Sequence, residues 1–149
     1  MDYTHVFEIS ASGMQAQKTR LEVAAHNLAN INTVMQADGT PYQPMRVVTR
    51  AGARVDAERF AQSMGQAGPV GQQGVKVAVV PDLSVTPRVV NEPGHPHADA
   101  NGMVRYPGVN HLDQMMTINE ALRAYEANVA AMQAAKTMAA RALDIGGGQ

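Results

Sequence analysis

Two histidines and an aspartate stand close together in the run His95-Pro96-His97-Ala98-Asp99, and another histidine follows at position 111. Imidazole and carboxylate groups bind divalent metals, and a catalytic zinc ion needs three such protein ligands and one open position. The run lacks the HExxH spacing of zinc peptidases, and its prolines favour a turn in which Asp99 bonds to the backbone. We therefore predict a turn here, with no metal site and no cofactor.

The serines lack the sequence context of a catalytic nucleophile. None of Ser10, Ser12, Ser63 and Ser84 lies in a Gly-x-Ser-x-Gly motif. The glycines of residues 61–74 precede a strand pattern and not a helix, which argues against a phosphate-binding loop. The chain has no cysteine, so it cannot form a disulfide or supply a thiol. We predict no catalytic residues and no enzymatic activity.

Charge and hydropathy exclude further classes. The chain has 12 Lys and Arg against 13 Asp and Glu, with no basic run, which argues against a nucleic-acid partner. No stretch reaches the ~20 apolar residues of a membrane-spanning helix. The start, Met1-Asp2-Tyr3-Thr4-His5, has neither the positive nor the apolar segment of a secretory signal. We expect that any export from the cytoplasm proceeds without a cleaved signal peptide.

The first long helix is predicted between Thr4 and Asn32, a range with a narrow apolar face. Its larger apolar residues recur every seven positions: Phe7, Met14, Leu21 and Leu28. Several amides and apolar residues follow one another at its end: Asn27, Leu28, Ala29, Asn30, Ile31 and Asn32. Amides at that place are typical of plain helix termination. The apolar residues between them suit a surface that meets another chain.

The second long helix is predicted after Pro107-Gly108, with Asn110 as the cap and Asp113 in the first turn. Its apolar residues occupy two heptad positions, Met115, Leu122, Val129 and Leu143 at one, and Ile118, Tyr125, Met132 and Ala139 at the other. This alternation of three and four residues is typical of a coiled-coil seam, which only Lys136 interrupts. Such thin, alanine-rich helices need neighbours to cover them, which favours a subunit of an assembly.

The middle of the chain has short strand patterns at residues 46–49, 75–80, 88–90 and 103–106. Asn101-Gly102 is a dipeptide favoured in two-residue hairpin turns. Residues 61–74, rich in Gly and Gln, are expected to be an exposed, mobile loop. We predict an α+β fold in three parts: an N-terminal axial helix (1–36), a β-rich middle domain (37–108) and a C-terminal axial helix (109–149).

Several of these motifs together resemble the flagellar axial proteins of the rod and hook. The general signature is Ser12-Gly13-Met14 followed by Asn27-Leu28-Ala29-Asn30 and Asn32-Thr33. Features further along resemble the proximal-rod members of that family: Pro41-Tyr42, Val47-Val48, Gly74-Val75-Lys76-Val77, Pro93-Gly94-His95-Pro96, Ala98-Asp99-Ala100-Asn101-Gly102 and Tyr125-Glu126-Ala127-Asn128. His26 departs from the family pattern, which has a small or acidic residue there.

The resemblance implies a structural subunit of the bacterial basal-body rod, the shaft that transmits torque from the rotor ring to the hook. It implies partners: copies of this chain, other rod proteins, the MS ring and its rod adaptor, and the type III export apparatus. It places the subunit in the periplasmic rod, with no small-molecule substrate. We expect the assembly interface to comprise Met14, Leu21, Asn27, Leu28, Ala29, Asn30, Ile31, Met115, Ile118, Leu122, Tyr125, Val129 and Met132.

Three other interpretations of the sequence stay open. An independent coiled-coil interaction module would share the seams but would form a closed oligomer when purified. Another rod protein of the same family would share the terminal helices and differ in the middle of the chain. A metal-dependent enzyme would contain stoichiometric metal that is lost on replacing His95 or His97.

Overall fold

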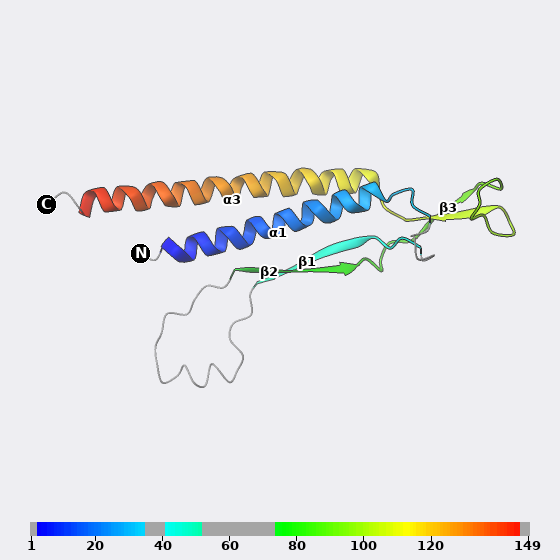
Figure 1. Cartoon of the computed structure of the whole chain (residues 1–149), viewed down its shortest axis with the longest axis horizontal. Coiled ribbons are helices and arrows are strands. Elements are labelled where there is room, and N and C mark those ends of the chain that lie inside the picture. The colour runs from blue at the N-terminus through cyan, green and yellow to red at the C-terminus, as the bar shows by residue number, and fades with distance from the viewer. Residues whose placement is uncertain (1–2, 35–40, 52–73, 147–149) are drawn as a thin grey trace, which may run out of the picture. The chain divides into compact units, whose positions relative to one another are not determined.

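A computed structural model of the chain describes residues 3–34, 41–51 and 74–146, with the side chains of residues 6–34, 41–51 and 74–144 (Figure 1). The elements are α1 (Tyr3–Ala29), β1 (Met45–Ala51), β2 (Val75–Pro81), β3 (Arg88–Asn91), β4 (Met103–Tyr106) and α3 (His111–Gly146). Along the chain, one long helix precedes a set of short strands and a second long helix follows them, which confirms the predicted α+β class. Residues 61–73 of the predicted loop lie outside the described residues.

Helix α1 ends at Ala29, three residues before the predicted end at Asn32. The reason is competition for backbone groups by the Asn30 side chain. Asn30 Nδ2 donates to the carbonyl of His26 at 2.9 Å, and the Asn30 backbone N–H reaches the same carbonyl at 3.2 Å. Asn30 Oδ1 accepts from the hydroxyl of Thr33 at 3.2 Å. A local amide thus terminates the helix, as asparagine commonly does.

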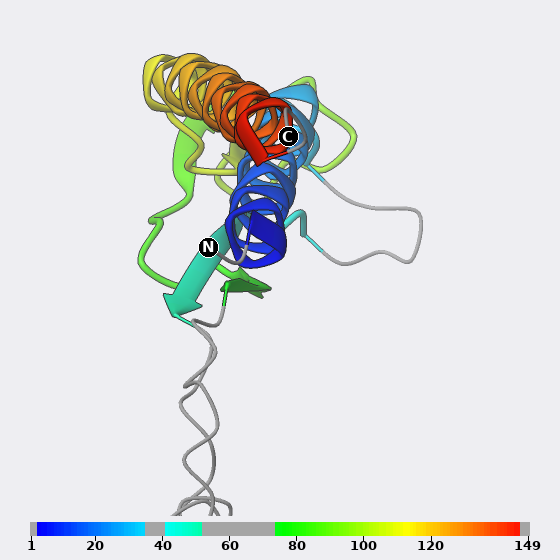
Figure 2. The ribbon, with the colours of Figure 1, turned by 90° about the vertical axis from the view of Figure 1, so that its left-hand side faces the viewer.

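Helix α3 has 36 residues and is one continuous helix in both views (Figure 1 and Figure 2). The predicted cap is confirmed, because Asn110 Oδ1 accepts from the backbone N–H of Leu112 at 3.0 Å. Asp113 lies in the first turn, where its charge complements the positive end of the helix dipole. At a rise of ~1.5 Å per residue the helix is about 54 Å long.

The strands form two two-stranded sheets, β1 with β2 and β3 with β4. In the second sheet the antiparallel register pairs Arg88 with Tyr106 and Val90 with Val104. Val104 is fully buried, and the guanidinium of Arg88 lies 5.3 Å from the centre of the Tyr106 ring. This cation–π contact covers one end of the sheet.

The two-residue hairpin turn expected at Asn101-Gly102 is not the connection between β3 and β4. That connection is longer and runs from residue 92 to residue 102. Gly102 instead closes a tight turn, with its N–H bonded to the carbonyl of Asp99 at 2.9 Å and a positive φ of 73°. The dipeptide therefore supplies the left-handed conformation directly before β4, which only glycine adopts at little cost.

The described residues divide into two compact units, each containing part of both helices. One unit comprises the described residues 3–18, 49–51, 74–77 and 122–146, and the other comprises residues 19–34, 41–48 and 78–121. Most apolar side chains buried among the described residues are alanines: Ala16 and Ala135 in the first unit, and Ala24 and Ala121 in the second. Tyr42 and Val104 of the second unit are the larger ones. The three-part division at residues 36 and 108 stays a prediction. Among the described residues, no helix combines the length and apolar character needed to cross a membrane.

Candidate assembly surface and signature contacts

The apolar heptad residues of α3 are incompletely covered by the rest of the chain. Met115, Leu122 and Tyr125 expose 39, 43 and 41% of their surface, and Leu143 exposes 76%. Ile118, Val129 and Met132 are half-buried. We call the set of Met115, Ile118, Leu122, Tyr125, Val129 and Met132 the α3 stripe. Exposed apolar surface that continues along a helix is a recognised mark of a site for another protein.

A different face of α3 is the covered one, and its residues are small or polar. Ala121 and Ala135 expose 0 and 2% of their surface, whereas Ala127 is exposed. In the first unit a Cβ placed on Gly13 of α1 would lie 3.1 Å from Nδ2 of Asn128. Helix α1 and this face of α3 therefore approach closely because glycine and alanine leave room, and larger apolar side chains remain outside the contact.

The predicted interface residues of α1 fall into two groups. Met14, Leu21, Leu28 and Ile31 are half-buried and Ala29 is exposed, so they keep surface for a neighbour. Asn27 exposes only 3% of its surface, and Asn30 forms the helix-ending contacts described above. The structure thus buries Asn27 and leaves Asn30 half-buried, and that both amides belong to the assembly interface stays a prediction.

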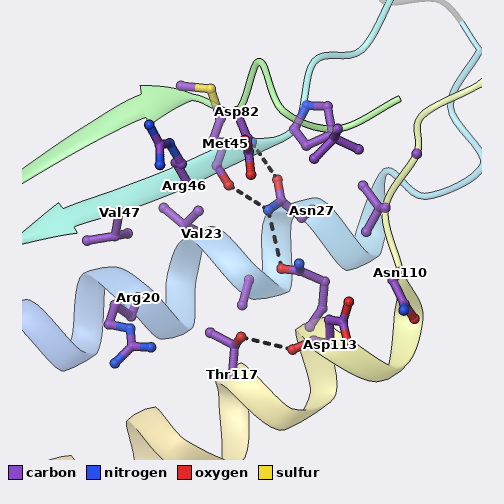
Figure 3. Close-up of a pocket in the computed structure, with 16 residues that line it drawn as sticks. Arg20, Val23, Asn27, Met45, Arg46, Val47, Asp82, Asn110, Asp113 and Thr117 are labelled. Carbon is purple, nitrogen blue, oxygen red and sulfur yellow. Dashed lines mark hydrogen bonds between the residues drawn. The ribbon is translucent and has the colours of Figure 1, made fainter. Parts of the chain in front are cut away.

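The Asn27 side chain binds the first residue of β1 through both of its polar atoms (Figure 3). Its Nδ2 donates to the carbonyl of Met45 at 2.7 Å, and its Oδ1 accepts from the Met45 N–H at 2.9 Å. Nδ2 also donates to Oε1 of Gln114 at 3.3 Å, and Oδ1 accepts from the hydroxyl of Tyr42 at 2.9 Å. A carboxamide has two donor hydrogens and two acceptor lone pairs, so all four are used.

The hydroxyl of Tyr42 links this network to His26. Nδ1 of His26 lies 3.0 Å from the Tyr42 oxygen. Because the single Tyr42 hydroxyl proton goes to Asn27, this second bond requires Nδ1 of His26 to be the donor. Burial raises the pKa of Tyr42. His26, the residue that departs from the family pattern, therefore has a hydrogen-bonding role on this network.

The Ser12-Gly13 signature has a comparable position in the first unit. Oγ of Ser12 accepts from the backbone N–H of Val75, the first residue of β2, at 3.0 Å and donates to the carbonyl of Ile9 at 2.8 Å. A Cβ on Gly74 would collide with this hydroxyl. Nothing in the local sequence pattern around Ser12 shows that a strand begins beside it.

A cavity of about 370 Å³ lies beside Asn27 in the second unit (Figure 3). Its lining contains Arg20, Arg46, Asp82 and Asp113, so charges of both signs are present. The hydroxyl of Ser84 donates to Asp82 at 2.6 Å, which together with other contacts lowers the pKa of that carboxyl. Among these lining residues there is no histidine, serine or cysteine, and the hydroxyl of Thr117 donates to the backbone carbonyl of Asp113 at 2.9 Å.

The histidine run predicted to form a turn does form one. Nδ1 of His95 accepts from the N–H of His97 at 3.1 Å, and Oδ1 of Asp99 accepts from the N–H groups of Asn101 and Met103 at 2.8 and 2.9 Å. These backbone bonds lower the pKa of Asp99, with the Met103 bond the larger cause. In the part of the chain that the structure describes, no three His, Cys, Asp or Glu residues are grouped as metal ligands.

Comparison with known proteins identifies the family. Residues 7–34 match the family model described as flagella basal body rod protein, and residues 100–145 match the C-terminal model of the flagellar basal body rod FlgEFG proteins. The chain is 39% identical to flagellar basal-body rod protein FlgC of Salmonella typhimurium over 98% of this chain and 99% of the relative. The chain belongs to the FlgC family. It is also 34% identical to FlgC of Bacillus subtilis, over 95% of this chain and 97% of that relative.

As a member of the FlgC family the chain is a structural subunit of the flagellar basal-body rod, as its proximal-rod motifs predicted. The two family models cover most of α1 and most of α3, together with strand β4. The C-terminal match is to a description that names the FlgE, FlgF and FlgG proteins. The α3 stripe thus lies within the residues that match this C-terminal family model.

Proposed function

We propose that this FlgC-family subunit joins the rod through the α3 stripe, with apolar residues along α1 and directly after it as a second contact. The support is the incomplete burial of Met115, Leu122 and Tyr125 on a helix whose neighbouring face is already covered at the small residues Ala121 and Ala135. Water-exposed apolar surface gains roughly 25 cal/mol for each Å² that a neighbour covers. Packing along several turns therefore supplies a substantial driving force for assembly.

The contacts proposed for α1 are Met14, Leu21, Leu28, Ala29 and Ile31, which keep some exposure. Asn27 and Asn30 support this surface from within the subunit, because they hold the end of α1 and the strand beside it. Contacts between two different surfaces of successive copies do not close on themselves and therefore produce a helical assembly. That geometry suits a rod better than it suits a closed oligomer.

We also propose the finer setting that the resemblance implies. The subunit would reach the periplasm through the flagellar type III export apparatus without cleavage and would lie in the rod between the MS ring, with its adaptor, and the hook. Its partners would be other rod proteins and its own copies, and its task would be to transmit torque. The family descriptions, which name the basal-body rod, support this setting.

A charge placed in the α3 stripe tests the proposed contact. In Leu122→Asp the isolated subunit should fold normally, because residue 122 is 43% exposed. A neighbour that covers this position would have to bury an unpaired carboxylate, which costs several kcal/mol. Cells that carry only this variant should export the subunit but should lack complete rods in electron micrographs and should not swim.

The matched control is Ala127→Asp, an equal charge on the same helix at an exposed position outside the α3 stripe. These cells should build rods and swim. Circular dichroism and thermal unfolding of both purified variants check that the two subunits are equally folded. Normal swimming of the Leu122→Asp cells would show that the α3 stripe is not an assembly contact.

A further inference from the structure

The dipeptide Asn101-Gly102 has a chemical reactivity that sets Asn101 apart from the other asparagines. The side-chain amide of an asparagine can be attacked by the backbone nitrogen of the next residue. Glycine in that next position hinders the attack least, because it has no side chain and a freely variable backbone. Asn101 is the only asparagine of the chain that a glycine follows, and its side chain is exposed to water.

This reaction consumes only water and involves no oxidation or reduction. The Gly102 nitrogen gives up its proton and forms a bond to Cγ of Asn101, while the C–N bond of the side-chain amide breaks. The amide nitrogen takes up the proton and leaves as ammonia, and a five-membered succinimide ring remains. Water then opens the ring at one of its two carbonyl carbons, which gives an aspartyl or an isoaspartyl residue at this position.

The structure holds the attacking nitrogen in a hydrogen bond. The N–H of Gly102 donates to the carbonyl of Asp99 at 2.9 Å, and the carbonyl of Gly102 accepts from the N–H of Glu92 at 2.8 Å. A Cβ on Gly102 would lie 3.1 Å from Cγ of Pro93, so the glycine is packed against the other end of the same connection. The nucleophile is the deprotonated nitrogen, so a bond that keeps its hydrogen in place opposes the first step.

Asp99 also fixes the residues on both sides of Gly102. Its Oδ1 accepts from the N–H groups of Asn101 and Met103 at 2.8 and 2.9 Å, and its own N–H donates to the carbonyl of Met103 at 3.0 Å. Its negative charge disfavours a second negative charge on the nitrogen between those two residues. All of these bonds lie within residues 92–103 of the second unit, and none of them involves α1 or α3.

We propose that Asn101 is a site of spontaneous deamidation and that the turn built on Asp99 suppresses the reaction while the connection between β3 and β4 is folded. The Gly102 nitrogen can attack only after this turn has opened, so the reaction rate falls with the fraction of open turns. An unfolded chain has none of these bonds and reacts at the full rate. The proposal concerns the chemistry of one turn and does not depend on the α3 stripe being an interface.

The test compares purified basal bodies, in which the subunit is folded, with the same material unfolded in guanidinium chloride. Both samples are incubated in one mildly alkaline buffer and then dissociated and digested with trypsin, which releases residues 89–105 as a single peptide. Tandem mass spectrometry measures deamidation at each position of this peptide. Its other asparagine, Asn91, is exposed but precedes Glu92, so it serves as the internal control. Asn101 should react at least about tenfold faster in guanidinium chloride than in basal bodies, and faster than Asn91.

Substitutions separate the reactive dipeptide from the turn that protects it. Asp99→Ala removes the carboxylate and should speed the reaction in basal bodies severalfold without changing its rate in guanidinium chloride. Asp99→Asn keeps an acceptor oxygen and should retain most of the protection. Gly102→Ala should slow the reaction at Asn101 in guanidinium chloride, where folding plays no part, because the added methyl group hinders the attack.

Three results would overturn the proposal. Equal rates at Asn101 in basal bodies and in guanidinium chloride would show that the folded turn gives no protection. A rate at Asn101 no higher than that at Asn91 in the unfolded chain would show that the dipeptide is not a reactive site. Unchanged protection in rods assembled from Asp99→Ala would show that Asp99 does not suppress the reaction. If Asp99→Ala builds no rods, the wild-type comparison still decides.

Discussion

Nδ1 of His26 and the hydroxyl oxygen of Tyr42 lie 3.0 Å apart, and their rings are inclined by 40° with centres 5.7 Å apart. The hydroxyl proton is committed to Asn27, so His26 must carry hydrogen on Nδ1. Nitrogen-15 NMR of His26 should show a protonated Nδ1 in the neutral ring. The wild-type pattern should persist in Tyr106→Phe and should change in Tyr42→Phe, which removes the acceptor.

Ionisation of Tyr42 should lower the free energy of unfolding at alkaline pH. Burial raises the folded-state pKa of Tyr42 above its ordinary value of 10.0. Its contribution is therefore complete below pH 10.0 and is lost as pH rises through the folded-state pKa, because the unfolded chain releases the proton first. Urea unfolding between neutral and strongly alkaline pH measures this loss.

In Tyr42→Phe the alkaline decline should be smaller, and the free energy of unfolding at neutral pH should fall by about 1 kcal/mol for the lost hydrogen bond. Tyr125→Phe is the control, since that side chain is 41% exposed on the α3 stripe. An unchanged alkaline decline in Tyr42→Phe would show that another group causes it.

Gly108 should not tolerate a side chain. A Cβ there would collide with the carbonyl oxygen of Thr86 and would lie 2.7 Å from Cγ1 of Val85. Gly108→Ala must push two backbone segments apart, and we expect a loss of about 1–3 kcal/mol in the free energy of unfolding. Gly94→Ala is the control, because no atom lies within 4 Å of its added Cβ. Equal melting temperatures for the two variants would contradict this account.

Asp99 should make the turn before β4 sensitive to acid. The N–H groups of Met103 and Asn101 hold the pKa of Asp99 below its ordinary value of 3.8. The stabilisation is complete above pH 3.8 and is lost as pH falls through the folded-state pKa. The Met103 and Asn101 amide resonances should therefore titrate with a midpoint below 3.8. Asp99→Asn keeps an acceptor oxygen and should abolish the titration while β3 and β4 remain paired.

The α3 stripe can also be tested by cross-linking, because the chain contains no cysteine. Tyr125→Cys places a single thiol on the α3 stripe, and Ala127→Cys places one at an exposed position outside it. In purified basal bodies a short thiol-specific cross-linker should join the first variant to a neighbouring subunit far more efficiently than the second. Similar yields at both positions would argue against a preferred contact along the α3 stripe.

Local signals in the sequence determined the elements. The heptad spacing of Leu122 and Val129 predicted a long C-terminal helix, and Asn110 with Asp113 predicted its start, because caps and dipole charges act within one turn. The strand patterns placed all four strands, and the motifs that resemble rod proteins predicted the family. Signals of this kind need only neighbouring residues, so a single sequence suffices to read them.

The faces that are buried were decided by the tertiary structure. The larger apolar residues of α3 were expected in the seam, yet Ala121 and Ala135 are the most covered residues of that helix, and Leu122 remains 43% exposed. Burial depends on which side of a helix meets another element. At Gly13 and Asn128, α1 and α3 lie so close together that the contact leaves little room for large apolar side chains.

The hydrogen-bond partners of the signature amides likewise could not all be predicted from the sequence. An asparagine at a helix end has the same local pattern whether it caps the helix, meets another chain or binds a strand. Asn30 ends α1 through a carbonyl four residues away, which local reasoning anticipates. Asn27 binds Met45 and Gln114, and the latter lies 87 residues further along the chain. Only the folded chain brings these groups within hydrogen-bonding distance, so the sequence determined which residues carry amides and the tertiary structure decided their partners.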